Sequence, residues 1–224
     1  ITGTPEKDGS ASVSVNYDEY PKERSASDML YLNTALKIFS TVYKNRVHAR
    51  RKEYDVRPCI VAANHTRILD TPALLYALRT IGFQPRETVY LARFLRFFDG
   101  RISHKTYRAI GRIPIDRFNN PRPGYEALER CLKNGYTVLI HPEGLLSQDG
   151  NMGKFKNGAF TLAIDNNVPV LPVRIEGAYE ILPYDLLDKT LPKLLNKGKR
   201  FEINIYIGDY IYPDTSNSSE FLER

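Results

Sequence analysis

The feature that most constrains the fold of this chain is a repeated alternation of short apolar runs with longer amphipathic runs. The short runs are rich in β-branched or aromatic side chains, which favours buried strands. They are residues 59–63, 88–92, 112–116, 137–141, 170–175 and 201–207. Helical spacing is found at residues 122–133 and 158–166, and after Thr71, which is predicted to cap a helix with Pro72 at its first position. The alternation predicts an α/β fold with a mixed, largely parallel central sheet flanked by helices.

Length and composition predict one domain. With 224 residues, of which 42% are hydrophobic, the chain can bury one substantial core but is short for two. Residues 1–27 start without a methionine and include a small, polar stretch, so we expect a linker or a boundary there and a folded domain over residues 28–224. We also expect that the domain is a fragment of a longer protein, with a possible fusion to an upstream domain.

Residues 28–47 predict an amphipathic N-terminal helix. Apolar side chains recur at helical spacing and a cationic cluster follows them. The apolar stripe is Met29, Leu30, Leu32, Leu36, Phe39, Val42 and Tyr43, and the cluster is Lys44, Arg46, Arg50, Arg51 and Lys52. Such a helix suits the boundary between acyl chains and anionic headgroups, and it is equally typical of a surface helix packed on a core. The pattern alone leaves both interpretations open.

The candidate catalytic residues lie where the first predicted strand ends. The apolar run there gives way to Asn64 and His65, and Asp70 follows a few residues later. Loops at the carboxyl ends of such strands are where α/β proteins place their sites. A histidine with one ring nitrogen held by a carboxylate presents the other nitrogen to a substrate as a general base. Because no nucleophile motif is visible, the hydroxyl that is activated is predicted to belong to the acceptor substrate.

Two further strand ends carry polar residues to the same predicted edge of the sheet. Residues 137–144 run into a sharp turn that contains Glu143, and residues 111–117 deliver Arg117. A metal site built from these histidines and carboxylates is disfavoured, because no short two-histidine spacing is present. The edge is therefore predicted to hold a metal-free acid–base site.

In their order and spacing these residues resemble the glycerolipid acyltransferases typified by 1-acylglycerol-3-phosphate acyltransferase. The family's Asn-His-x-x-x-x-Asp corresponds to residues 64–70, and its Gly-x-Ile-x-x-Asp-Arg corresponds to residues 111–117. Its Phe-Pro-Glu-Gly corresponds to residues 141–144, with His141 in place of Phe, and its Val-Pro-Val-x-Pro corresponds to residues 168–172. His141 itself is interpreted as a hydrogen-bonded strand histidine rather than a second catalytic group.

The resemblance implies an acyltransferase domain that moves a fatty acyl group from acyl-CoA or acyl-carrier protein to the hydroxyl of a glycerolipid or lysophospholipid, without a metal or cofactor. It implies His65 as the general base and Asp70 as the residue that orients it. The residues that it places in substrate binding are Asn64, Arg117, Glu143 and Gly144.

One departure from the family concerns the acceptor. The family usually follows Glu-Gly with Thr-Arg-Ser, whereas residues 145–147 of this chain read Leu-Leu-Ser. Loss of that cation puts a phosphorylated acceptor in doubt. Lys154 and Lys156 are candidate substitutes, because a lysine on a loop binds phosphate as a point charge.

Charge and hydropathy leave other functions to be weighed. A formal net charge of +6 and a pI near 9.2 favour anionic partners, which include phospholipid headgroups and nucleic acid. Residues 91–101 interleave aromatic side chains with arginines, a pattern that suits a nucleobase or an acyl channel. No nucleic-acid-binding motif is recognisable, so a nucleic-acid-binding module is disfavoured. A catalytically idle lipid-binding domain of the same fold is the other alternative.

The expected location is peripheral, on the cytoplasmic face of a membrane. No apolar run in the sequence is long enough to span a bilayer. The two cysteines, Cys59 and Cys131, fit neither a metal-binding spacing nor a disulfide framework, which favours a reducing compartment.

Overall fold

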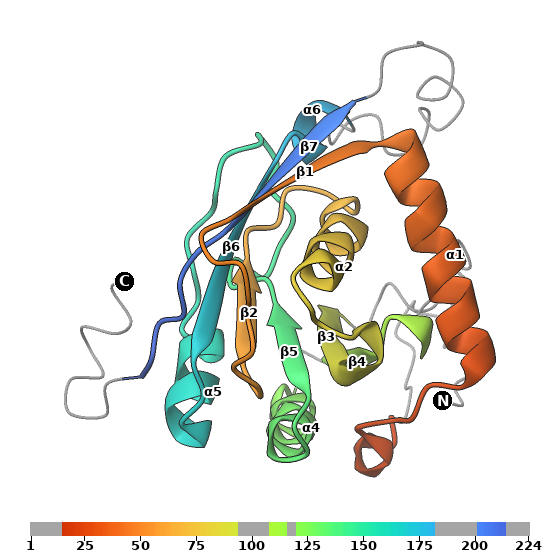
Figure 1. Ribbon diagram of the computed structural model, residues 1–224. Helices are drawn as coiled ribbons and strands as arrows, with labels where there is room; N and C mark the ends of the chain where they lie inside the picture. The colour runs from red at the N-terminus through yellow and green to blue at the C-terminus, as the bar shows by residue number, and fades with distance from the viewer. Residues whose placement is uncertain (1–14, 94–107, 116–119, 182–200, 214–224) are drawn as a thin grey trace, which may run out of the picture.

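The computed structural model describes residues 15–93, 108–115, 120–181 and 201–213. These residues form a seven-stranded sheet in the order β1-β7-β6-β2-β5-β3-β4, with helices packed against it (Figure 1). The strands are β1 (Lys44–Ala49), β2 (Ile60–Ala63), β3 (Thr88–Arg93), β4 (Arg112–Ile115), β5 (Thr137–Ile140), β6 (Val170–Glu176) and β7 (Glu202–Ile207). The helices are α1 (Ala26–Val42), α2 (Asp70–Thr80), α4 (Arg122–Lys133), α5 (Gly158–Asn166) and α6 (Ala178–Ile181), with short 3₁₀ turns at Tyr17–Glu19 and Pro85–Glu87.

The sheet is mixed and largely parallel, which confirms the predicted fold class. Strands β6, β2, β5, β3 and β4 pair in parallel. Strand β7 is antiparallel to β6, and β1 is parallel to β7, so these two strands run in the opposite direction. The carboxyl ends of the five parallel strands therefore meet at one edge of the sheet, which is where such folds place ligands.

Two hydrophobic clusters cover the two faces of the sheet. Along β2, Val61 and Ala63 belong to the cluster that contains α1 and α2, whereas Ile60 and Ala62 belong to the cluster that contains α4 and α5. Successive strand residues point to opposite faces, so a strand buried on both faces is apolar at every position. This explains why the central strands could be recognised in the sequence as short apolar segments.

Strand β1 corrects the predicted N-terminal helix. The helix was expected over residues 28–47, but α1 ends at Val42 and the chain continues as the edge strand Lys44–Ala49. The β1 side chains are exposed or half-buried, and Lys44 and Arg46 form ion pairs with Glu202 on the neighbouring strand. An edge strand with polar side chains is common, because charge on an edge prevents further strand pairing. Such a strand lacks the apolar alternation on which the sequence prediction relied.

The start of α2 also differs from the prediction. Thr71 was expected to cap this helix, but the N-cap is Leu69 and Asp70 is the first helical residue. The carboxylate of Asp70 accepts the backbone N–H groups of Thr66 and Arg67. The turn before the helix is thus organised around Asp70, because its side chain supplies acceptors that the cap residue lacks.

Helix α1 is amphipathic and packs on the core. Ser25 and Asp28 form a capping box at its N-terminus, and Arg108 donates two hydrogen bonds of 2.9 Å to the Asp28 carboxylate. Leu32, Leu36 and Phe39 are buried, whereas two other apolar residues, Leu30 and Ile38, remain exposed. The predicted stripe therefore includes the packing face but is wrong at Leu30, which is 69% exposed.

Part of the predicted linker packs on the domain. Arg24 donates to the backbone oxygens of Pro85 and Arg86, each at 2.6 Å, and to that of Thr88. Arg130 donates to the backbone oxygen of Tyr17 at 2.6 Å. Residues 17–25 thus contact the folded unit. The aromatic and arginine-rich segment expected at residues 91–101 lies mostly outside the described residues, and so does Arg117.

Candidate active site

His65 and Asp70 share one turn between β2 and α2. His65 Nδ1 lies 3.1 Å from Asp70 Oδ2, and the Asp70 side chain is fully buried while that of His65 is 17% exposed. An ionised carboxylate only accepts hydrogen bonds, so the ring nitrogen that faces it is the one that carries the hydrogen. In this tautomer Nε2 carries the lone pair. The predicted pair is thus brought together in the geometry of a general base and its orienting carboxylate.

Asp70 is held by four donors. In addition to His65, the backbone N–H groups of Thr66 and Arg67 donate to Oδ2 at 2.6 and 2.7 Å, and the Thr66 hydroxyl donates to Oδ1 at 3.2 Å. Burial raises the pKa of Asp70 to about 6, although these hydrogen bonds oppose the shift. Hydrogen bonds of this kind, together with the position at the start of α2, favour the ionised form that His65 needs.

Asn64 and Glu143 fasten the His65 turn to its neighbours. The Asn64 side chain donates to the Ile175 carbonyl at 2.9 Å and accepts the Ile175 N–H at 2.7 Å, which ties the end of β2 to β6. Glu143 accepts the N–H of His65 at 2.7 Å through Oε1 and that of Gly153 at 2.7 Å through Oε2. Both side chains are buried. In the structure, both predicted binding residues therefore contact backbone around the turn of residues 64–70, which carries the candidate catalytic pair and is called the catalytic turn below.

A second imidazole lies against His65. The rings of His65 and His141 are stacked with centroids 3.9 Å apart and planes 4° apart. His141 Nδ1 is 2.8 Å from the Ala63 carbonyl, which fits the predicted hydrogen-bonded strand histidine. Burial, together with the neighbouring His65, lowers the pKa of His141 to about 3. His141 is therefore neutral at ordinary pH.

Arg67 is a buried cation that the sequence reasoning missed. Its guanidinium donates to the backbone oxygens of Thr66 at 2.5 Å and Ser147 at 2.7 Å, and it lies over the Tyr179 ring at 4.1 Å. The Ser147 N–H in turn donates to the His65 carbonyl at 2.9 Å. Arg67 thus links the catalytic turn to the loop that follows Gly144. Arg67 occupies one of the unspecified positions, marked x, of the family motif Asn-His-x-x-x-x-Asp, so the motif did not indicate that it is buried.

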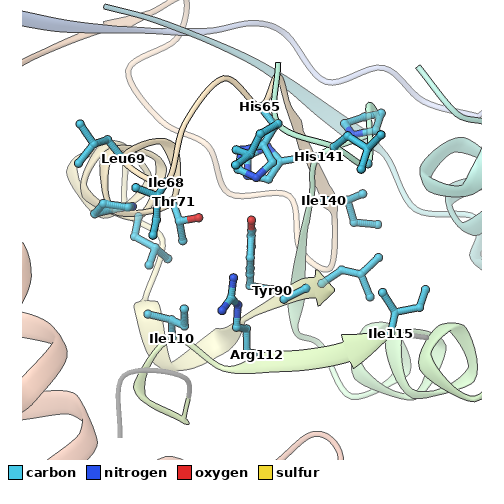
Figure 2. A pocket seen from close by; sticks show the side chains of 18 of the residues that line it. His65, Ile68, Leu69, Thr71, Tyr90, Ile110, Arg112, Ile115, Ile140 and His141 are labelled. Carbon is cyan, nitrogen blue, oxygen red and sulfur yellow. The ribbon is translucent and has the colours of Figure 1, made fainter. Parts of the chain in front are cut away.

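His65 lies at the wall of a largely apolar cavity of about 610 Å³, and Asp70 is buried behind it. Residues from α1, the start of α2, β3, β4, β5 and the turn after β5 line it, and most of these residues are apolar. Figure 2 shows the two imidazoles on one side, the Tyr90 hydroxyl pointing toward them, and Arg112 beside Tyr90. Cavities of this size hold drug-sized ligands. The space suits an extended hydrocarbon chain whose reactive end meets His65.

The predicted cationic and turn residues divide into two groups. Gly144 and Lys156 line the cavity, whereas Lys154 is exposed on the loop next to it and does not line the wall. Arg112, which was not predicted, is the other cation of the described lining. A charged residue inside the otherwise apolar run of β4 was the available signal for it.

Within the described part of the chain, no helix is long and apolar enough to cross a membrane, and no cluster of metal-ligating side chains is present.

Several backbone N–H groups near His65 that could stabilise an oxyanion are already engaged. Those of His65, Thr66 and Arg67 donate to Glu143 and Asp70. The N–H of Gly144 donates to the His141 carbonyl at 2.9 Å. These groups hold the two turns in shape, and so the oxyanion donors must be sought elsewhere in the cavity wall.

Residues 42–176 match the family model described as acyltransferase, which is more than half of the chain. The chain belongs to the acyltransferase family. It is 32% identical over 129 residues to a chloroplastic 1-acyl-sn-glycerol-3-phosphate acyltransferase of Brassica napus, which covers 56% of the chain and 35% of that relative. It is 29% identical over 159 residues to the human 1-acyl-sn-glycerol-3-phosphate acyltransferase beta, covering 67% of the chain and 53% of the relative.

A solved acyltransferase structure has the same fold. The crystal structure of the 1-acyl-sn-glycerophosphate acyltransferase of Thermotoga maritima matches with a TM-score of 0.58 at 21% identity, over 90% of this chain and 79% of that one. The chain spans about a third to a half of the length of the curated relatives it matches. The family assignment and the fold are thus supported independently of the site geometry.

Proposed function

We propose that this chain is an O-acyltransferase that moves a fatty acyl group from a thioester carrier, acyl-CoA or acyl-carrier protein, to the hydroxyl of a glycerolipid or lysophospholipid. The observation that carries the proposal is the 3.1 Å contact between His65 Nδ1 and Asp70 Oδ2 at the wall of an apolar cavity. Several relatives named 1-acyl-sn-glycerol-3-phosphate acyltransferase support this choice of substrates. The reaction belongs to lipid biosynthesis and needs no metal or cofactor.

In the proposed reaction His65 is the general base. Its Nε2 takes the proton of the acceptor hydroxyl while the hydroxyl oxygen attacks the thioester carbonyl carbon. The tetrahedral intermediate collapses as the carbon–sulfur bond breaks, and the thiolate takes the proton back from the imidazolium. The products are an ester and a free thiol. Asp70 orients the ring and stabilises its charged form throughout.

The oxyanion of the intermediate requires donors that the protein has not already used. The backbone N–H of Leu145 follows the Gly144 turn, and Leu145 lines the cavity. This N–H makes no hydrogen bond to the described residues. We assign it to the oxyanion, because a backbone donor fixed before the reaction requires no reorganisation in the transition state.

The acceptor is proposed to carry a phosphate near the cavity mouth. Lys156 lines the cavity, Lys154 lies next to it on the same loop, and Arg112 is located within the wall. Lys154 and Lys156 form no ion pair with the described residues, so their charge is available to a ligand. Gly144 and Arg117 complete the proposed acceptor site, and Arg117 lies outside the described residues. Asn64 and Glu143 are proposed to serve this site through the backbone they hold.

Membrane contact is proposed to occur at the cavity mouth, on the cytoplasmic face of a membrane. Ile68 and Leu145 line the cavity and are 41% and 57% exposed, and Met152 and Phe155 are exposed on the loop that carries Lys154. The cationic cluster of β1 is a weaker candidate, because its arginines are paired with Glu202 and Asp209. Exposed apolar groups beside unpaired lysines suit an anionic bilayer surface. Replacing Met152 and Phe155 with serine is expected to weaken sedimentation with anionic vesicles more than replacing Arg50 and Arg51 with alanine.

A panel of acceptors and donors tests the proposed function. The purified chain is incubated with lysophosphatidic acid, lysophosphatidylglycerol or monoacylglycerol, and with acyl-CoA or acyl-carrier protein, and the products are identified by mass. A diacylated product from a phosphorylated acceptor is expected. Binding of acyl chains without any product would favour an idle lipid-binding domain. Tight, strongly salt-dependent binding of polynucleotides would instead favour the nucleic-acid-binding alternative.

A further inference from the structure

The stack between His65 and His141 supplies a constraint that Asp70 does not. Asp70 contacts the edge of the His65 ring, through Nδ1, and does not contact its face. The face of the His141 ring lies 3.9 Å away at an interplanar angle of 4°. A parallel neighbour at van der Waals distance limits rotation of the His65 ring out of its plane. His141 therefore restrains the plane of the His65 ring.

His141 is itself held rigidly. Its Nδ1 donates to the Ala63 carbonyl at 2.8 Å, and the edge of the Tyr90 ring packs against it at a centroid distance of 5.5 Å. The residue is 8% exposed, and its Nε2 has no hydrogen-bond partner among the described residues. Because Nδ1 carries the hydrogen, Nε2 is bare and the ring is neutral. A buried ring with a bare nitrogen and no donor to pair with it costs stability, so its place beside the general base calls for a functional reason.

We propose that His141 is a positioning residue, whose neutral ring, stacked face to face on His65, fixes the plane of the general base and stabilises the imidazolium that this base becomes. The inference rests on the proposed function, in which His65 takes a proton. A cation is attracted to the face of an aromatic ring, and the attraction grows when water is excluded. The imidazolium thus gains from the stack what neutral His65 does not.

The charged and titratable groups around the two rings are compatible with this role. Asp70 approaches His65 from α2, and Glu143 accepts the His65 N–H from the turn after β5. Tyr90 approaches His141 from β3, and burial raises its pKa, so it is neutral. Arg112 lies beyond the Tyr90 ring, 5.4 Å from its centroid, and Arg67 is bonded to backbone oxygens. Both carboxylates thus favour a positive His65. Asp70 also raises the pKa of His141, but burial and His65 outweigh this effect, so the charge stays on His65.

Three substitutions separate the aromatic face of His141 from its hydrogen bond. His141→Phe keeps a flat ring and loses the donor to Ala63, His141→Asn keeps a donor and loses the ring, and His141→Leu loses both. The matched control is His48→Phe, because His48 stacks on Tyr206 at 4.6 Å and 13° on an exposed strand, away from the cavity. Circular dichroism establishes that each variant is folded, and His141→Leu replaces His141→Asn if the latter does not fold.

The expected result depends on the aromatic face. His141→Asn should lower kcat by about 10- to 100-fold with KM nearly unchanged, His141→Phe should lower it by less than about fivefold, and His48→Phe should leave it unchanged. The midpoint at which the His65 ring takes its proton, followed by NMR, should move to lower pH in His141→Asn and remain in place in His141→Phe. This readout does not depend on turnover, so it tests the stack even if every acceptor proves inactive.

Two outcomes would overturn the inference. One is a folded His141→Asn variant with the kcat and the His65 titration midpoint of the wild type. The other is an equal loss of kcat in His141→Phe and His141→Asn with an unmoved midpoint, which would show that His141 only fills space. Inactivity of the wild type with all acceptors would refute the proposed function instead, and the NMR comparison would still decide the role of the stack.

Discussion

The catalytic turn and the β1 edge both concentrate charged and polar residues, but they use them in opposite ways. In the turn, Asp70 is fully buried and is held by four donors, and Arg67 is fully buried and bonded to two carbonyls. On β1 and in the turn that follows it, the partners of each ion pair are half-exposed to mostly exposed, as in the 2.6 Å contact between Arg51 and Asp209. Removing the partner of a buried polar group lowers stability, because the group stays buried without a hydrogen bond, whereas exposed ion pairs are screened by water. The difference teaches that burial and the hydrogen bonds of Asp70 and Arg67, not charge density, distinguish the candidate site from the exposed edge.

The largest effect is expected from Asp70→Asn. An amide keeps the size of the side chain but presents an N–H where the carboxylate accepted hydrogen bonds, so His65 loses its correct tautomer. The rate of acyl transfer should fall by about 10²- to 10⁴-fold. The measurement is steady-state kinetics on the folded variant. A fall in rate smaller than about threefold would show that Asp70 has no role in catalysis. Asp209→Asn, on the exposed edge, is the matched control and should leave the rate unchanged.

The next effect is on stability. Arg67→Met keeps much of the side-chain volume but leaves the carbonyls of Thr66 and Ser147 without their donor, so the free energy of unfolding should fall by about 2–4 kcal/mol. Urea unfolding measures it. Arg122→Met, at a side chain that is 83% exposed, should change the value by less than about 0.5 kcal/mol. Equal changes in the free energy of unfolding for the two substitutions would contradict the contrast between buried and exposed charged residues.

The response to pH should differ between activity and folding. The pKa of Asp70 is raised to about 6, so the carboxylate that His65 needs is lost as the pH falls below that value. Activity should then drop by about tenfold per pH unit on the acid side. A raised carboxyl pKa has the opposite effect on folding, because Asp70 destabilises the fold as the pH rises from its ordinary value of 3.8 through about 6. A pH–rate profile with parallel circular dichroism checks this, and acid unfolding that tracks the loss of activity would contradict it.

The smallest effect is expected on the exposed edge. Arg51→Ala removes the contact with Asp209, but both side chains are about half-exposed, so the urea midpoint should stay within the error of the measurement and become insensitive to added salt. A shift of the urea midpoint as large as that of Arg67→Met would mean that the ion pair at this edge stabilises the fold despite its exposure.

Much of the fold could be predicted from the sequence because its central strands are buried on both faces. Residues 59–63 and 138–140 are apolar without interruption, and the amphipathic helix at residues 122–133 was predicted with the bounds that the structure shows. Strand β1 could not be predicted in this way, since its polar side chains face water and its identity depends on pairing with β7. When the conformation of a segment depends on pairing with another strand, its own sequence gives little indication that it is a strand.

The candidate site was predictable in its catalytic pair but not in its surroundings. His65 and Asp70 lie in one turn, so their proximity follows from local spacing. The stack of His65 on His141 depends instead on the register in which Ala62 pairs with Ile140. The burial of Arg67 depends on a loop that returns from Ser147. Sequence patterns report neither the register of parallel strands nor the path of a distant loop.

The central claim, that His65 is the base for acyl transfer, is tested most directly by mass detection of the acylated product formed by His65→Ala. The claim predicts that the rate falls by about 10²- to 10⁴-fold while the circular dichroism spectrum is retained, and that His48→Ala, at an exposed position on β1, forms product at the wild-type rate. A folded His65→Ala variant that forms product as fast as the wild type would contradict it.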